Sequence, residues 1–110
     1  MGRWRYLLLE ELSEEPMDGG QLLDALRRSL RELFGCMGLI EASPRLLYHS
    51  GRYSVIRCPS DEVDRIRASL IFASDASRGP IAVRVKRSSG TLRALKPSLS
   101  SGGMGGDQPG

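Results

Sequence analysis

The chain has 110 residues, of which 40% are hydrophobic and 26% charged, and its formal net charge is +3. This length allows one hydrophobic core, and the composition is too apolar for a wholly disordered protein. Because no run approaches the ~20 apolar residues of a membrane span and no signal peptide is visible, we predict one cytoplasmic domain over residues 1–96 without membrane contact.

The first predicted element is a buried strand within residues 3–12. Its sequence, RWRYLLLEEL, is aromatic and aliphatic and too short for a stable free helix. Whether Trp4 and Tyr6 lie in the core or at an interface stays open. We expect the glutamates at and after the end of this strand to be solvated and not to hold Mg²⁺. They are Glu10, Glu11, Glu14 and Glu15.

The clearest predicted helix spans residues 21–34, where leucines recur at helical spacing. Asp18 is placed to cap its start, and Gly35 stands where a C-terminal glycine cap belongs, before a hinge region at Gly38. Three arginines lie off the leucine stripe, where they face either RNA or a protein partner. They are Arg27, Arg28 and Arg31.

Two short β-prone runs, 45–49 and 52–58, flank the Ser-Gly pair of a tight hairpin. An amphipathic helix follows from Asp61 and fades by about Ser77. After a turn at residues 78–80, apolar and polar residues alternate from Ile81 to Lys86 as in a half-buried strand.

The element order βαββαβ predicts an α+β, ferredoxin-like (RRM-like) sandwich. In it a four-stranded antiparallel sheet carries both helices on one face. Ten of the last fourteen residues are Gly, Ser or Pro, which bury little surface. We therefore expect residues 97–110 to form a disordered tail.

The positive charge is concentrated late in the chain. Residues 1–64 carry 8 basic and 11 acidic residues, whereas residues 65–110 carry 8 basic and 2 acidic ones. Between Ala76 and Lys96 there are six basic residues and no acid, and 14 of the 16 basic residues of the chain are arginines. Arginine suits bidentate phosphate contacts, so nucleic acid is the leading class of partner.

If the apolar residues of the last strand face the helices, its basic residues project from the opposite face. A glycine between hydroxyl residues, in the segment Ser89-Gly90-Thr91, lets backbone N–H groups approach a phosphate. A solvated polar face without a ligand is the alternative. The predicted RNA-binding residues are Arg84, Lys86, Arg87, Ser89, Arg93 and Lys96, with additional RNA or partner contacts at Arg5, Arg27, Arg28, Arg31 and Tyr53.

Other residue types indicate no enzyme site. Cys36, Cys58 and His49 are too few for a zinc site, and we expect both cysteines to be buried thiols, with a disulfide as the alternative. Tyr6 and Tyr53 are the aromatics available for base stacking, although Val55 and Ile56 stand where an RRM would place a second exposed aromatic. We therefore favour recognition of phosphate and shape over sequence reading, and predict no bound cofactor.

Several segments together resemble the archaeal ribonuclease P protein component 2 family, called the Pop-five family in eukaryotes. They occur in family order and span residues 3–96, but the family is usually more apolar at residues 86–88. The matching segments are RYLLLE (5–10), RELFG (31–35), IRC (56–58), VDRIRASL (63–70), GPIAVRV (79–85) and SGTLRAL (89–95).

The resemblance implies a non-catalytic subunit of ribonuclease P, an endoribonuclease whose RNA performs metal-dependent 5′ maturation of precursor tRNA. It implies binding to the RNA's catalytic domain, Mg²⁺ at that RNA, pairing with a TIM-barrel protein subunit, and homodimerisation into a heterotetramer. Two alternatives stay open. One is a free-standing RNA-binding or ribosome-associated module, and the other is a small acylphosphatase-like enzyme, which the acidic loop SEEPMDGG (13–20) disfavours.

Overall fold

A computed structural model of the protein describes residues 3–75 and 77–95. Its four long strands and two helices follow the predicted βαββαβ order, with short elements between and after them. The strands are β1 (Trp4–Glu11), β2 (Arg45–Ser50), β3 (Tyr53–Pro59), β4 (Ser74–Asp75), β5 (Gly79–Pro80) and β6 (Val83–Ser89). The helices are α1 (Gly19–Ala42), α2 (Val63–Ile71) and the 3₁₀ turns η1 (Ser60–Glu62) and η2 (Arg93–Leu95). The predicted tail, 97–110, lies outside the described residues.

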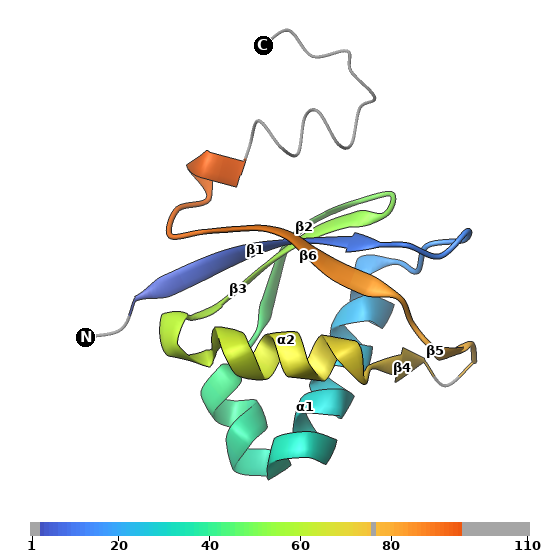
Figure 1. Ribbon diagram of the computed structural model, residues 1–110, viewed down its shortest axis with the longest axis horizontal. Helices are drawn as coiled ribbons and strands as arrows, with labels where there is room; N and C mark the ends of the chain where they lie inside the picture. The colour runs from blue at the N-terminus through green and yellow to red at the C-terminus, as the bar shows by residue number, and fades with distance from the viewer. Residues whose placement is uncertain (1–2, 76, 96–110) are drawn as a thin grey trace, which may run out of the picture.

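The main sheet has the strand order β2-β3-β1-β6, and each neighbouring pair is antiparallel. In Figure 1, α1 and α2 lie on one side of this sheet, and η2 lies on the other. The predicted ferredoxin-like class is therefore confirmed. β1 is central, so residues of β1 meet both β3 and β6.

Helix α1 begins as predicted but does not end where the sequence suggested. Asp18 and Gln21 form a capping box, in which the Asp18 carboxylate accepts a hydrogen bond from the Gln21 backbone N–H at 2.8 Å. At Gly35 the backbone turns to φ 78° and ψ 177°, a conformation that favours glycine, and the helix then resumes to Ala42. Gly38 is not a hinge: it is buried in this second part, with no room for a Cβ beside Phe34.

The region after α2 also departs from the prediction. The helix ends at Ile71, and the predicted turn at residues 78–80 belongs to a small hairpin that pairs β4 with β5. Gly79 has φ 83°, which explains a glycine at this turn. β6 begins only at Val83, although Ile81 is buried in the core as expected.

The main core lies between the sheet and the helices. Leu7 and Leu9 point from β1 toward α1 and α2, as the strand alternation requires. The helices contribute Ile66 and the first part of the predicted apolar stripe, in which Leu22, Leu26 and Leu30 are buried and Leu23 is partly buried. The last two residues predicted for that stripe, Leu33 and Phe34, are exposed. Within the described residues, no helix is long and apolar enough to cross a membrane.

A second, smaller cluster lies on the other face of the sheet. Leu8 and Val55 are cross-strand neighbours, and both are fully buried beneath Leu95 of η2. Figure 1 shows η2 above this face, away from both helices. The sheet is therefore not fully open on that side, because the chain after β6 covers its centre.

Candidate nucleic-acid interface

The basic residues of β6 project from the face opposite the helices, as the alternation predicted. Val83 and Val85 pack toward the main core. The register between β1 and β6 shifts between Leu8 and Leu9, so that Val85 faces Leu9 and Arg87 faces Leu8. Lys86 is the extra residue of this bulge. Because of the bulge, two consecutive cationic residues lie on the face that carries Leu8.

Arg84 is held by a carboxylate of the neighbouring strand. Its Nε and Nη2 atoms each lie 2.8 Å from Oε1 of Glu10, and the Tyr53 hydroxyl lies 3.3 Å from Oε2. Burial favours a higher pKa for Glu10, but the hydrogen bond and charge of Arg84, together with Lys86 and Tyr53, outweigh it and lower the pKa below its ordinary value. Arg84 therefore braces the sheet, and Glu10 offsets its charge.

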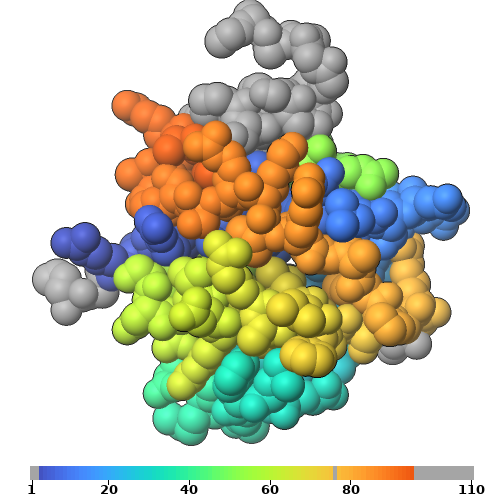
Figure 2. Space-filling model, in the orientation of Figure 1, coloured from blue at the N-terminus to red at the C-terminus, as the bar shows by residue number. Residues whose placement is uncertain are grey.

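Of the other predicted RNA-binding residues, Lys86 lies near this ion pair, whereas Ser89 lies at the other end of β6 and Arg93 lies beyond it. The Lys86 ammonium lies 5.1 Å from the centre of the Tyr53 ring, and Arg93 is exposed on η2. The Ser89 hydroxyl accepts a hydrogen bond from the Thr91 backbone N–H at 3.1 Å, which shapes the turn around the glycine between them. Lys96 lies outside the described residues. Figure 2 shows β6 and the segment after it, in orange, over a broad part of the surface above α2.

Sequence reasoning missed Arg57, which lies on the same face. Its guanidinium carbon is 4.2 Å from the centre of the Trp4 ring. Trp4 is 45% exposed, whereas Tyr6 is half-buried against the Leu8 cluster. Trp4 is therefore a surface residue and not part of the core, and Tyr6 packs against the cluster of Leu8, Val55 and Leu95. The pairing of β1 with β3, in which Tyr6 lies opposite Arg57, brings the Arg57 guanidinium next to the Trp4 ring.

Negative charge is scarce on this face. Strands β2, β3 and β6 contain no Asp or Glu, and β1 ends in Glu10 and Glu11. The expectation that both are solvated was wrong, because Glu10 binds Arg84 and Glu11 is 2% exposed on the helix side. The Glu11 carboxylate accepts a 2.7 Å hydrogen bond from the Met17 backbone N–H. Glu14 and Glu15 are exposed, as expected.

The arginines of α1 do not join this surface. Arg28 donates a 3.2 Å hydrogen bond to the Ser74 carbonyl oxygen, and Arg27 and Arg31 are exposed on the helical layer. A separate ligand or partner would be needed to engage them. Among the described residues there is no group of three or more His, Cys, Asp or Glu side chains able to hold a metal ion.

The two cysteines occupy different environments. Cys36 is exposed beside the α1 kink, which contradicts its expected burial, whereas Cys58 is buried and both are free thiols. Burial, together with Glu62 and Asp61, raises the pKa of Cys58 to about 11, so this thiol stays protonated at neutral pH. His49 shares a 2.8 Å hydrogen bond with Ser54 in the β2–β3 hairpin, an ordinary strand role.

Comparison with known proteins places the whole described domain in one group. A sequence profile of the Rpp14/Pop5 family matches residues 5–99. The chain is similar to ribonuclease P protein component 2 of Methanocaldococcus jannaschii, with 32% identity over 92 residues, which cover 84% of this chain and 69% of that protein. The Pyrococcus furiosus protein of the same name is 25% identical over 99 residues, covering 88% and 82% of the two chains.

The fold has a counterpart among solved structures. A chain in the cryo-EM structure of yeast ribonuclease MRP superposes with a TM-score of 0.68, covering 94% of this chain and 93% of that one. The sequence identity is 16%, so this likeness concerns the fold.

Proposed function

Since this chain belongs to the Rpp14/Pop5 family and is a protein subunit of ribonuclease P, we propose that it binds and stabilises the catalytic domain of ribonuclease P RNA. That RNA would then perform the 5′ maturation of precursor tRNA. The protein would contact the precursor tRNA only indirectly. One observation carries the proposal: the basic side chains of β6 and η2 share the sheet face on which Glu10 is the one strand carboxylate.

The proposed mechanism is electrostatic. Folding an RNA brings phosphates close together, and their mutual repulsion must be offset by cations. Exposed basic side chains, among them Lys86 and Arg93, would replace some of the condensed counterions at one RNA surface. The protein would therefore lower the Mg²⁺ concentration at which the RNA folds and cleaves, and Mg²⁺ bound to the RNA would supply the metal-dependent hydrolysis.

Reconstitution at limiting Mg²⁺ tests this role. We expect cleavage of a precursor tRNA by ribonuclease P RNA to rise at least about tenfold when the protein is added at low Mg²⁺, and to rise little at saturating Mg²⁺, because the protein and the metal relieve the same repulsion. The measurement is the initial rate of 5′ leader release across a Mg²⁺ series. An equal protein effect at every Mg²⁺ concentration would contradict the electrostatic role.

A protein partner is proposed for the other side of the molecule. On both sides of the Gly35 kink, α1 exposes four large apolar side chains, with Met37 and Ile40 each 66% exposed. Arg65 fixes this region of α1, since its Nη1 atom lies 2.8 Å from Oε1 of Glu41 and its guanidinium lies over the Phe34 ring. Exposed apolar patches of this kind mark protein interfaces. The patch comprises Leu33, Phe34, Met37 and Ile40.

The proposed occupant of this patch is the TIM-barrel subunit implied by the family resemblance. The patch lies on the helical layer, and the RNA is proposed to bind the sheet face. The protein could therefore bind the TIM-barrel subunit and the RNA at the same time. Homodimerisation into a heterotetramer is the alternative use of the patch.

Lysines in the patch test this assignment. We expect the double variant Met37→Lys, Ile40→Lys to bind the TIM-barrel subunit at least about tenfold more weakly, because two charges would be buried unpaired in the interface. Isothermal titration measures the affinity, and Leu12→Lys, another exposed apolar position, is the control with no expected effect. If light scattering instead shows that the double variant loses only a homodimer, the occupant is a second copy of the chain.

A further inference from the structure

The first residues of β1 have one unpaired edge. β6 pairs with β1 as far as the Tyr6–Ser89 pair and then turns away at Gly90. Trp4 and Arg5 pair only with β3, through Pro59 and Cys58. In Figure 2 the start of β1, in dark blue, protrudes between the segment after β6 and the yellow-green start of α2.

A hollow of about 560 Å³ occupies this position. That volume lies within the roughly 300–1,000 Å³ typical of small-molecule sites. No residue of the helical core contributes to it, so it is a surface feature at the corner of the sheet. Its lining residues are Arg3, Trp4, Arg5, Tyr6, Ser60 and Gly90.

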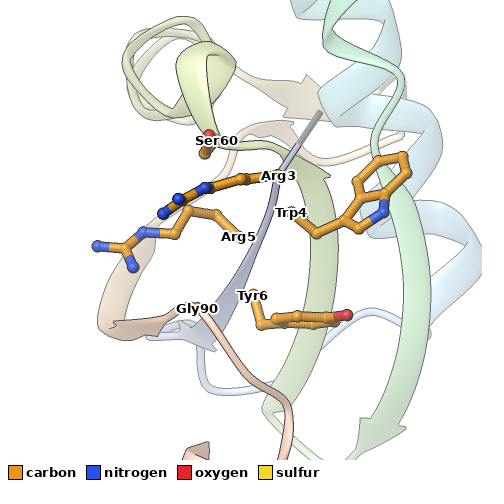
Figure 3. A pocket seen from close by; sticks show the side chains of 6 residues that line it. All are labelled: Arg3, Trp4, Arg5, Tyr6, Ser60 and Gly90. Atoms are coloured by element: carbon orange, nitrogen blue, oxygen red, sulfur yellow. The ribbon is translucent and has the colours of Figure 1, made fainter. Parts of the chain in front are cut away.

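The two sides of the hollow differ in chemistry. Figure 3 shows Arg3 and Arg5 extending to one side of β1 and the rings of Trp4 and Tyr6 to the other, as strand alternation requires. Within residues 3–75 and 77–95, neither the Arg3 nor the Arg5 guanidinium has a hydrogen bond or ion pair. The Gly90 backbone, without a side chain, borders the cationic side.

These features match a ligand with an anionic end and a flat aromatic end. Trp4 carries the Arg57 guanidinium against its ring and still leaves 45% of its surface exposed. A base stacked on this indole would extend the Arg57–Trp4 pair, and its phosphate would reach the guanidinium groups across the unpaired strand edge. Nucleotides combine these two ends.

We propose that this hollow binds one unpaired RNA nucleotide, with its phosphate at Arg3 and Arg5 and its base on Trp4. The proposal rests on the proposed function, which supplies RNA as the ligand, and adds a site for single-stranded RNA beside the phosphate-binding sheet face. The nucleotide must be unpaired, because a base inside a duplex is already stacked on both faces.

Intrinsic fluorescence gives a direct readout, since Trp4 is the single tryptophan of the chain. We expect a short oligouridylate to quench the Trp4 emission in a saturable way at low salt. A blunt RNA duplex of equal length should leave the emission nearly unchanged, although it binds the sheet face through its phosphates. Equal quenching by both RNAs would contradict a site for an unpaired base.

Gly90 offers a matched pair of variants. A Cβ at this position would lie 3.5 Å from Nη1 of Arg5, an ordinary contact, and the Gly90 backbone is not in the positive-φ region. Gly90→Ala should therefore bind oligouridylate within about twofold of the wild type. Gly90→Asp places a carboxylate beside Arg5, and we expect about a tenfold loss of affinity, since roughly one charged phosphate contact is lost.

A second measurement separates this proposal from the proposed function. The wild-type protein and the Gly90→Ala and Gly90→Asp variants are compared for binding to a ribonuclease P RNA transcript. Two results would overturn the nucleotide site but not the proposed function. In the first, the wild-type protein binds the transcript but oligouridylate does not quench the Trp4 emission. In the second, the Gly90→Asp and Gly90→Ala variants bind oligouridylate with equal affinity. Failure of the wild-type protein to bind the transcript would instead overturn the proposed function.

Discussion

Replacing Lys86, Arg87 and Arg93 together by glutamine is expected to weaken binding to ribonuclease P RNA roughly 100-fold at low salt. Each replaced cation removes at most one charge-assisted phosphate contact, and three contacts of about 1 kcal/mol each account for a change of this size. Arg84 is left intact in this variant because it holds Glu10 and thereby braces β1 against β6.

The salt dependence of this variant gives a sharper measurement than one affinity. The slope of log K against log salt should fall by about 0.7–0.9 for each phosphate contact removed, hence by about two to three for the triple variant. Filter binding over a salt series measures the slope. An unchanged slope would show that these side chains do not meet phosphates.

A control of equal charge is available on the helical layer. Arg27, Arg28 and Arg31 lie there on α1, so replacing them by glutamine changes the net charge by the same amount. We expect this control to bind RNA within about threefold of the wild type, because screening weakens charges that lie more than about 10 Å from the RNA. If the two triple variants lose affinity equally, binding follows net charge, and the sheet face is not the interface.

Replacing Leu95 by alanine is expected to lower the free energy of unfolding by about 2–3 kcal/mol. Leu95 is fully buried against Leu8 and Val55, and a buried Leu→Ala change removes apolar contacts and leaves a cavity. The lower part of the usual range applies because η2 is a short 3₁₀ turn that can relax around the cavity. Urea denaturation followed by circular dichroism measures the loss.

Leu47→Ala is the comparison for this prediction. Leu47 is an exposed residue of the edge strand β2, so its truncation should cost about 0.5 kcal/mol or less. Similar small losses for both variants would mean that η2 does not cover the sheet in solution. A large loss for Leu95→Ala alone would show that η2 covers the centre of this face in solution and closes it to RNA bases, unlike an RRM.

Local patterns were sufficient for the element order and much of the geometry. The leucine stripe and Asp18 predicted where α1 begins, and the alternation from Val83 to Lys86 predicted which side chains face the helices. These signals are local because helix and strand periods repeat within a few residues. The βαββαβ order then restricted the sheet to few topologies, which is why the ferredoxin-like class was predictable.

Only the tertiary structure decided which charges are paired and which surfaces are covered. Glu10 meets Arg84 across 74 residues of sequence, and Arg57 reaches Trp4 through the pairing of β1 with β3. Both contacts depend on strand register, and a shift of one residue would send every side chain to the other face. The bulge beside Leu8 is such a shift of register, and no local sequence pattern predicts it. The sequence by itself thus determined the fold class and the positive charge of the segment that contains β6. The long-range register of the strands determined which side chains meet on the proposed RNA-binding face.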